Sequence, residues 1–202
     1  LEPDSPNVFL HFKIRKGDVE KGFQEADLIL ENRFSTSRIN HCQLETHQAY
    51  AWQEPDGSFV IRTSSPGTGA GIQALARHFN LPASRIRGIY PYVGGGFGGK
   101  LQTVLEPYCG LLAQRTGRPV KMVLSREEEF FLGKPRSGSV IQLKTGVTRD
   151  GTLTARQARM YFDTGFACHP RSTEIAPTVI RGPYNIPHVR FEAFCVYTNK
   201  MG

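Results

Sequence analysis

A run of seven residues, Gly94 to Lys100, has the composition of a ligand-binding loop. Its sequence is GGGFGGK, so five glycines surround Phe97. Glycine has no Cβ, so bare backbone can approach a ligand closely, and the amides of such a loop can donate to anionic oxygens. The spacing of Gly94, Gly96 and Gly99 also satisfies the GxGxxG pattern of dinucleotide-binding loops. The run therefore predicts a site for a large anionic ligand, with a tight structural turn as the alternative.

The residues after this run argue against a dinucleotide site. Such a site needs a helix N-terminus directly at the glycines. Pro107 follows Gly99 by eight residues and fits the first turn of a helix, so the helix begins too late. Leu101 stands where a Walker loop needs Ser or Thr, although Arg126 after the next strand would suit a 2′-phosphate. We keep a stand-alone dinucleotide- or phosphate-binding domain using Gly94–Gly99 as the alternative function.

Histidines and glutamates also occur at spacings that could serve catalysis or metal binding. His41, Glu45 and His47 form an HxxxExH pattern, and in a strand their side chains would share one face. A zinc site needs more than these residues, and no two of the four cysteines form a CxxC pair, so we predict no metal site. Glu106 and the glutamates at 127–129 are predicted to be surface or helix-end charges.

Composition limits the classes of protein to consider. The chain has 202 residues, 39% hydrophobic and 21% charged, which predicts a folded core and excludes a disordered or fibrous protein. The net charge of +7 suits an anionic partner, but the basic residues are scattered and match no nucleic-acid-binding pattern. No apolar run is long enough to span a membrane. The widely spaced cysteines predict reduced, mostly buried thiols and a cytoplasmic location.

The two ends of the sequence suggest a piece of a larger protein. The chain begins LEPDSPNVFLHF, without Met or a signal-peptide pattern, and it stops directly after a strand-like run with VYTNKMG.

Periodicity and turn signals predict a mixture of helices and strands. Strands are predicted at 28–36, 48–52, 58–63, 85–93, 120–124, 140–148, 152–162 and 189–198. Helices are predicted at 19–26, from 64–66 to 79, and from 106 to a stop at Gly117. The strand at 120–124 is predicted to be buried, and 171–187 is predicted to be a loop. Hairpins around 54–57 and 149–151 favour a layered α+β fold.

Beyond the glycine run, most of the chain resembles one known family. The matching segments, in order, are GDVEKGF (17–23), AD (26–27), HCQLETH (41–47), VGGGFGGK (93–100), TGRPVK (116–121), SREE (125–128), PYNIP (183–187) and TN (198–199). They resemble the molybdenum-binding large subunit of the xanthine dehydrogenase and aldehyde oxidase family of molybdenum hydroxylases. The resemblance implies two-layer α+β modules with mixed sheets. We expect a first molybdopterin-binding module at 1–125 and a truncated, hairpin-rich part of a second at 126–202.

The resemblance also implies a chemistry and a set of partners. A molybdenum held by molybdopterin, in its plain or its cytosine dinucleotide form, hydroxylates an aldehyde or an N-heterocycle with oxygen from water. Electrons leave through iron–sulfur clusters to flavin (FAD) on other domains or subunits. The partners implied are therefore the remaining segments of the large subunit, these redox domains and a small-molecule substrate, with no nucleic acid.

By position in the family pattern, the loop Gly95, Gly96, Phe97, Gly98 and Gly99 would bind the cofactor. Phe97 and Gly98 would lie beside the molybdenum and direct backbone amides at its ligands, while Gly96 would permit close approach.

Two further positions correspond to substrate contacts in the family. Leu101 aligns where purine-oxidising members carry a glutamate, which argues against an ordinary purine site. Arg136 lies near the position of a substrate-contacting arginine, with a surface arginine as the alternative. Pro66-Gly67 falls where many members carry a glutamine near the metal, so this sequence lacks that amide.

The catalytic base of the family is a glutamate far toward the C-terminus of the full subunit. No segment of this chain resembles that region, so no catalytic residue is assigned. The sequence predicts that these 202 residues alone bind no cofactor and are not an active hydroxylase.

Overall fold

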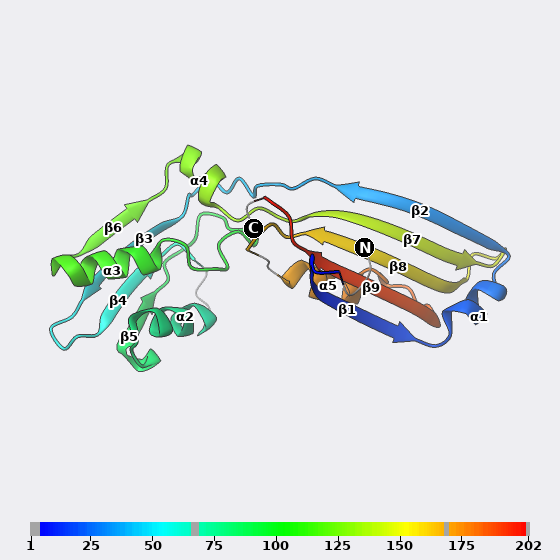
Figure 1. Ribbon diagram of the computed structural model, residues 1–202, viewed down its shortest axis with the longest axis horizontal. Coiled ribbons are helices and arrows are strands. Elements are labelled where there is room, and N and C mark those ends of the chain that lie inside the picture. The colour runs from blue at the N-terminus through cyan, green and yellow to red at the C-terminus, as the bar shows by residue number, and fades with distance from the viewer. Residues whose placement is uncertain (1–4, 66–68, 168–169, 201–202) are drawn as a thin grey trace. The chain divides into compact units, whose positions relative to one another are not determined.

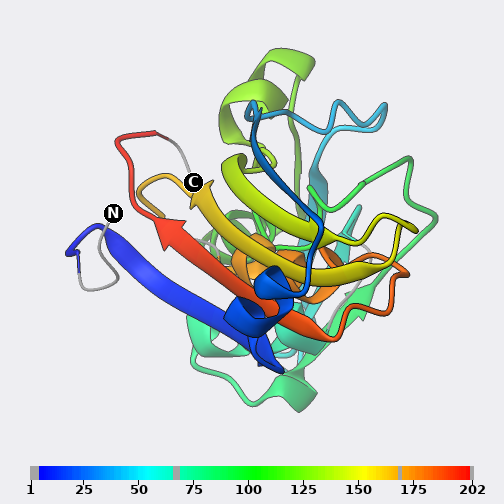
Figure 2. The ribbon, with the colours of Figure 1, turned by 90° about the vertical axis from the view of Figure 1, so that its right-hand side faces the viewer.

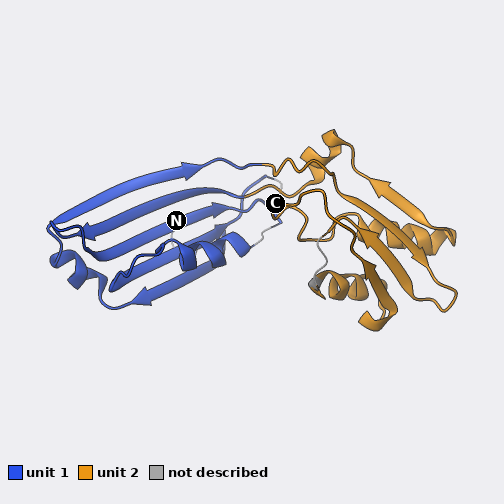
Figure 3. Cartoon of the chain, turned by 180° about the vertical axis from the view of Figure 1, so that it is seen from behind, with its two compact units in different colours: residues 1–39, 137–202 blue, residues 40–136 orange. Residues whose placement is uncertain are grey.

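The computed structural model describes residues 5–65, 69–167 and 170–200, and the chain forms two compact units (Figure 3). Unit 1 consists of Leu1–Ile39 and Ser137–Gly202, and unit 2 consists of Asn40–Arg136. This division differs from the predicted boundary at residue 125. The reason is strand pairing, because strands that precede unit 2 in the sequence join the sheet formed by strands that follow it.

Unit 1 is built on a five-stranded sheet of order β1-β9-β8-β7-β2, whose strands lie side by side in Figure 2. Its elements, labelled in Figure 1, are β1 (Val8–Lys16), α1 (Val19–Gln24), β2 (Leu28–Thr36), β7 (Gly138–Val147), β8 (Leu153–Asp163), α5 (Arg171–Val179) and β9 (His188–Val196). All neighbours are antiparallel except β8 and β9, which are parallel. The sheet is therefore mixed, as predicted.

The two faces of this sheet differ in character. Met160, Phe191 and Ala193 are buried in an apolar cluster to which α5 contributes. On alternate positions of the same strands, Phe194 stacks between His11 and Tyr161 with ring centroids 4.2 and 4.9 Å away. One face is thus an apolar core and the other an aromatic and charged layer.

Several sequence predictions for unit 1 are confirmed. Strand 28–36 has the predicted bounds, and β7 and β8 form the predicted hairpin, with Gly151 at φ +89° in its turn. Asp18 caps α1 by accepting hydrogen bonds from the amides of Glu20 and Lys21 at 3.0 and 3.2 Å. The β1 strand was not predicted.

The prediction of a loop at 171–187 is wrong over its first half, because Arg171–Val179 is the helix α5. Pro177 lies inside this helix, where proline removes one backbone hydrogen bond. Thr173 and Pro177 are both buried, so packing of one helix face against β1, β8 and β9 outweighs the local preference.

Unit 2 is built on a four-stranded sheet of order β5-β4-β3-β6. Its elements are β3 (Gln48–Gln53), β4 (Phe59–Thr63), α2 (Gly69–Phe79), the 3₁₀ helix η1 (Ala83–Arg85), β5 (Ile86–Ile89), α3 (Glu106–Thr116), β6 (Val120–Val123) and α4 (Arg126–Leu132). Helix α3 packs against β3, β4 and β6, and α2 packs against β5.

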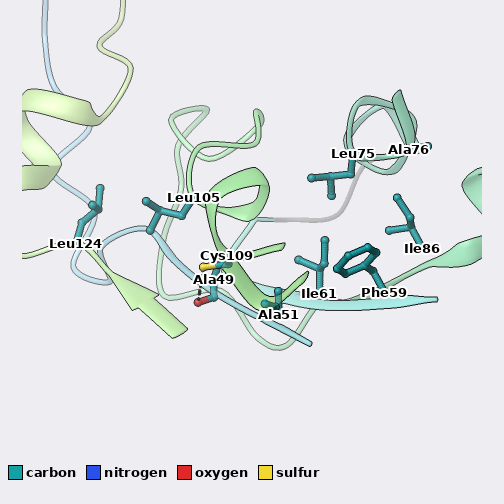
Figure 4. Close-up of a cluster of buried hydrophobic side chains, with 11 residues drawn as sticks. Ala49, Ala51, Phe59, Ile61, Leu75, Ala76, Ile86, Leu105, Cys109 and Leu124 are labelled. Atoms are coloured by element: carbon teal, nitrogen blue, oxygen red, sulfur yellow. Dashed lines mark hydrogen bonds between the residues drawn. The ribbon is translucent and has the colours of Figure 1, made fainter. Parts of the chain in front are cut away.

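The core of unit 2 lies between this sheet and the helices α2 and α3 (Figure 4). Phe59 stacks on Phe79 with ring centroids 4.7 Å apart. The Cys109 thiol donates to the Ala49 carbonyl at 3.4 Å, and burial raises the pKa of this thiol to about 11. Cys109 and Cys195 are free and buried and Cys42 is free and exposed, while Cys168 lies outside the described residues.

The hairpin around 54–57 and the helix at 106–116 are confirmed, and Gly117 ends that helix at φ +62°. Strand 120–124 is not buried as predicted, because β6 is an edge strand that pairs only with β3 among the described strands. Strand β5 is shorter than predicted and ends at Ile89. Helix α4 was not predicted, although Ser125 and Glu128 form a capping box at its start.

Helix α2 is confirmed as far as Phe79, the predicted last residue. Its first residue is Gly69, and the predicted start signal at Pro66 falls outside the described residues. Across the part of the chain that the structure describes, no helix combines the length and apolarity needed to cross a membrane.

Candidate functional site: a glycine loop held by buried carboxylates

The glycine run forms a loop between β5 and α3, both in unit 2. Gly95 and Gly98 have φ of +94° and +100°, a region that glycine adopts without strain. Phe97 itself has φ +48°, which is rare for a residue with a side chain. The next helix begins only at Glu106, so the expectation that this helix starts too late to present its N-terminus at the glycines is confirmed.

The loop lines a pocket of about 240 Å³. The lining residues are Val93, Gly95, Gly96, Phe97, Gly98, Lys100 and Leu101. The amides of Gly95, Gly96, Phe97 and Gly98 donate no hydrogen bond to any atom of the described residues. Free amides around a hollow are the donors that an anionic ligand needs.

Glu45 holds the two ends of this loop together. Its Oε2 accepts hydrogen bonds from the Gly94 amide at 2.9 Å and from Lys100 Nζ at 2.8 Å. Its own amide donates to the Gly94 carbonyl at 3.1 Å, and its Oε1 accepts from Gln48 Nε2 at 2.7 Å. The Lys100 side chain is 0% exposed, so Glu45 is the counter-charge of a buried cation.

The ionisation of Glu45 follows from these contacts. Burial by itself would raise the pKa of Glu45. The hydrogen bonds from Lys100 and the Gly94 amide outweigh burial and lower the pKa below its ordinary value. Glu45 is therefore a carboxylate at neutral pH and keeps Lys100 paired.

His41 packs against Gly99, near the C-terminal end of the glycine loop. A Cβ on Gly99 would lie 2.9 Å from His41 Nδ1, so only glycine fits against this ring. Burial and the nearby Arg136 cation lower the pKa of His41, which favours the neutral imidazole. Arg136 thus lies near the histidine, but it is exposed and does not line the loop pocket.

The segment that carries His41 and Glu45 is itself held by Glu129 of α4. Glu129 is 1% exposed and accepts hydrogen bonds from Gln43 Nε2 at 2.5 Å and from the His47 amide at 2.7 Å. The ring Nδ1 of His47 lies 2.7 Å from Glu129 Oε1. One buried carboxylate thus fixes both side chains and backbone of a segment without regular structure.

Glu106 is a second buried carboxylate that accepts hydrogen bonds from irregular backbone, in this case the segment that follows the glycine loop. Its oxygens accept hydrogen bonds from Thr63 Oγ1 at 2.6 Å and from the Val104 amide at 2.7 Å. The Ser65 hydroxyl donates to the Lys100 carbonyl at 2.9 Å. Glu106 does lie at a helix end as predicted, but neither it nor Glu129 is a surface charge. Both are buried, and neighbouring amides and side chains donate hydrogen bonds to them.

The predicted arrangement of His41, Glu45 and His47 is also corrected. These residues lie in a loop and not on one face of a strand. Glu45 pairs with Lys100, whereas His47 pairs with Glu129. Among the described residues, no group of three His, Cys, Asp or Glu side chains could hold a metal ion.

The structure therefore brings most of the predicted site residues to one place. Leu101 joins Gly95, Gly96, Phe97 and Gly98 in the pocket lining, whereas Gly99 and Arg136 do not line it. Pro66-Gly67 lies outside the described residues. Sequence reasoning did not assign roles to Glu45 and Lys100. The signal available was the lysine that ends the glycine run, since a lysine buried beside a loop requires a carboxylate partner.

Comparisons with known proteins give the site a context. The family model described as "Molybdopterin cofactor-binding domain" matches residues 1–202. The nicotinate dehydrogenase large molybdopterin subunit of Eubacterium barkeri is 37% identical over 98% of this chain and 49% of its own length. A probable xanthine dehydrogenase subunit of Bacillus subtilis is 37% identical over 96% of this chain and 26% of its own length.

The chain is also similar in fold to solved structures. The aldehyde oxidoreductase from Desulfovibrio gigas superposes with a TM-score of 0.87 at 28% identity, covering 98% of this chain and 22% of that one. Quinoline 2-oxidoreductase from Pseudomonas putida superposes with a TM-score of 0.86 at 25% identity, over 96% of this chain and 26% of that one. This chain thus spans about half, or less, of the length of these relatives.

Proposed function

We propose, because this chain belongs to the family of molybdopterin cofactor-binding domains, that its glycine loop holds part of the molybdenum cofactor in a larger oxidoreductase. The observation that carries the proposal is the pocket of about 240 Å³ lined by Gly95, Gly96, Phe97 and Gly98, whose amides donate no hydrogen bond within the described residues. The alternative of a stand-alone dinucleotide-binding domain lacks the helix N-terminus that would face the phosphates.

The residues of the loop fit this group. A cofactor rich in oxygen and sulfur acceptors needs donors without bulky side chains in front of them, and Gly95, Gly96 and Gly98 provide them. Positive φ at Gly95 and Gly98 is the kind of backbone geometry from which anion-binding loops are built. Glu45 and Lys100 keep both ends of the loop fixed, so the donors do not have to be ordered when the ligand binds.

The chain's own part in the reaction is to orient and to exclude water. The cofactor, when bound, supplies the oxidative hydroxylation of a carbon centre with oxygen from water. The amides of Phe97 and Gly98 hold acceptor atoms of the cofactor in place. The Phe97 ring is 72% exposed at the edge of the pocket, where it can cover the bound group.

Leu101 narrows the class of substrate. It lines the pocket and is 38% exposed, and its side chain neither donates nor accepts a hydrogen bond. We propose an aldehyde or an N-heterocycle as substrate, in keeping with the nicotinate, quinoline and aldehyde named for the relatives. A purine held by a carboxylate at this position is not compatible with leucine. Arg136 as a substrate contact stays a prediction.

The remaining parts of the reaction are proposed to lie on other segments or subunits. These are the catalytic glutamate, the rest of the pterin site, the iron–sulfur clusters and FAD. The cytosine dinucleotide form of the cofactor and a cytoplasmic location also stay predictions. We expect the 202 residues alone to bind no molybdenum and to be inactive.

A substitution at Gly96 tests the proposal in the parent protein. An added Cβ at Gly96 would meet the Lys100 side chain at 3.6 Å, an ordinary contact, so Gly96→Ala should fold normally. Its methyl group would lie against the pocket and displace the cofactor from the amides. We expect less molybdenum per chain, measured by mass spectrometry, and about ten-fold lower activity.

The matched control is Gly69→Ala at the start of α2, where an added Cβ meets nothing within 4 Å. This variant should keep its molybdenum and its activity. Full molybdenum content in a well-folded Gly96→Ala protein would contradict the proposed site.

A further inference from the structure

The four-stranded sheet of unit 2 has a second face that α2 and α3 do not cover. Ala49 and Ala51 of β3 and Ile61 of β4 point into the core beneath these helices. Side chains alternate along a strand, so Tyr50 and Arg62 point to the opposite face. Both of these residues are exposed, so this second face is open to a ligand.

A cation, an aromatic ring and a second cation form a row across this face. Tyr50 is the direct partner of Arg62 in the antiparallel pair β3–β4 and of Lys121 in the antiparallel pair β3–β6. Direct partners in a sheet project to the same face, with Cβ atoms about 5 Å apart. Arg62 and Lys121 therefore stand on either side of Tyr50 on this face of the sheet.

The row opens into a pocket of about 490 Å³, which is larger than the hollow at the glycine loop. Its lining is completed by the polar residues Glu45, Gln48, Thr63 and Ser64, the aromatic Tyr92, and Ala49 and Pro91. A pocket of this volume suits a small molecule, whereas protein partners usually dock on flatter and wider surfaces.

The pocket is lined by two cationic side chains and one carboxylate. Arg62 and Lys121 are exposed, and neither forms an ion pair with a carboxylate of the described residues. Glu45 is the acidic residue of the lining, and its charge is already matched by the buried Lys100. An anion would therefore meet two unpaired cations and no unmatched carboxylate.

We propose that this pocket binds a phosphate-bearing ligand with a planar ring, which is the chemistry of a nucleoside monophosphate. The phosphate would lie between Arg62 and Lys121, since a guanidinium binds phosphate oxygens in pairs and an ammonium adds a point charge. The planar ring would stack on Tyr50 or Tyr92. This pocket shares no lining residue with the loop pocket, so the proposal concerns a second site.

Binding can be measured on the whole chain through its one tryptophan. Trp52 lies next to Tyr50, with ring centroids 5.2 Å apart, and should report a ligand by its fluorescence. The probes are adenosine monophosphate, adenosine and inorganic phosphate. We expect adenosine monophosphate to bind more tightly than either of the other two, and more weakly as salt concentration rises.

Variants then test the residues. Arg62→Ala and Lys121→Ala should each weaken adenosine monophosphate about ten-fold, since each removes a charge-assisted hydrogen bond. Both side chains are exposed, so the fold should survive, as circular dichroism would show. Arg118→Ala is the matched control, because Arg118 is exposed and lies outside the pocket. The affinity of this variant for adenosine monophosphate should not change.

Three results would overturn the proposal. The first is equal binding of inorganic phosphate and adenosine monophosphate, which would exclude a role for the ring. The second is the absence of binding at millimolar adenosine monophosphate, as expected if the face instead docks an acidic protein. The third is binding that Arg62→Ala and Lys121→Ala leave unchanged, which would place the ligand elsewhere.

The parent enzyme distinguishes two sources of the same ligand chemistry. If the pocket takes a free nucleotide, adenosine monophosphate should bind the cofactor-loaded enzyme as well as it binds the chain alone. If a nucleotide group of the resident cofactor fills the pocket, the loaded enzyme should exclude the probe, and Lys121→Ala should lower its cofactor content.

Discussion

Buried and half-buried glutamates serve different purposes in the two units. In unit 1, Glu192 lies within β9, and its carboxylate faces side chains only, with Arg159 Nε at 3.3 Å and His11 Nε2 at 3.7 Å. In unit 2, Glu45, Glu106 and Glu129 each accept a hydrogen bond from a backbone amide of a loop.

The difference reflects how each unit satisfies its backbone. The long strands of unit 1 pair their amides and carbonyls with one another, so a carboxylate there can only neutralise neighbouring charges. The loops of unit 2 have no strand partner, and a buried amide without a partner is costly. The carboxylates accept the hydrogen bonds that a neighbouring strand would otherwise accept, and irregular backbone can therefore lie close to the candidate site.

The largest effect is expected from Glu129→Ala. It leaves the His47 amide, the His47 ring and the Gln43 side chain without their shared acceptor in a buried place. The free energy of unfolding should fall by about 3–5 kcal/mol in urea denaturation. Glu127→Ala in the same helix, where the residue is exposed, should change stability by less than about 0.5 kcal/mol.

A smaller effect is expected from Glu192→Ala in unit 1. Its hydrogen-bonded partner Arg159 has a side chain that is 49% exposed, so water can solvate this cation once the carboxylate is gone. The same denaturation measurement should show a loss of about 1 kcal/mol. If Glu192→Ala lowers the free energy of unfolding as much as Glu129→Ala does, the contrast between side-chain and backbone partners does not hold.

The smallest effect is a pH dependence confined to the glycine loop. The lowered pKa of Glu45 means that its contribution to stability is present above the ordinary value of 4.5 and is lost as pH falls through the lowered pKa. Hydrogen exchange at the Gly94 amide, corrected for the intrinsic rate, should therefore speed up in acid. Glu45→Gln should abolish this pH dependence, and its persistence in that variant would assign the effect to another group.

Much of the fold could be predicted from the sequence where the signals are local. The strand at 28–36, both hairpins and the helix that ends at Gly117 depend on alternation, turn residues and caps within a few positions. Helix α5 could not be predicted in this way, because Pro177 opposes it locally and its burial against the sheet supports it. Strand β6 shows the same limit, since an edge position depends on which strands lie beside it.

The candidate site was predictable in part. The glycine run marked the loop and the class of ligand it suits, because glycine content is itself the physical requirement. The carboxylates that hold the loop were not predictable, since Glu45 and Glu129 meet their partners across 49 to 86 positions of sequence. A glutamate in a sequence carries no mark of whether distant amides will bury it.

The discontinuous layout of unit 1 has a consequence for how the chain folds during synthesis. All of unit 2 is contained in 40–136 and can form its sheet as soon as those residues are available. Strand β1 must wait, because β9, its strand partner among the described residues, is made near the end of the chain. Long-range pairing of this kind is slow, so unit 2 should be the first part of a nascent chain to resist proteolysis.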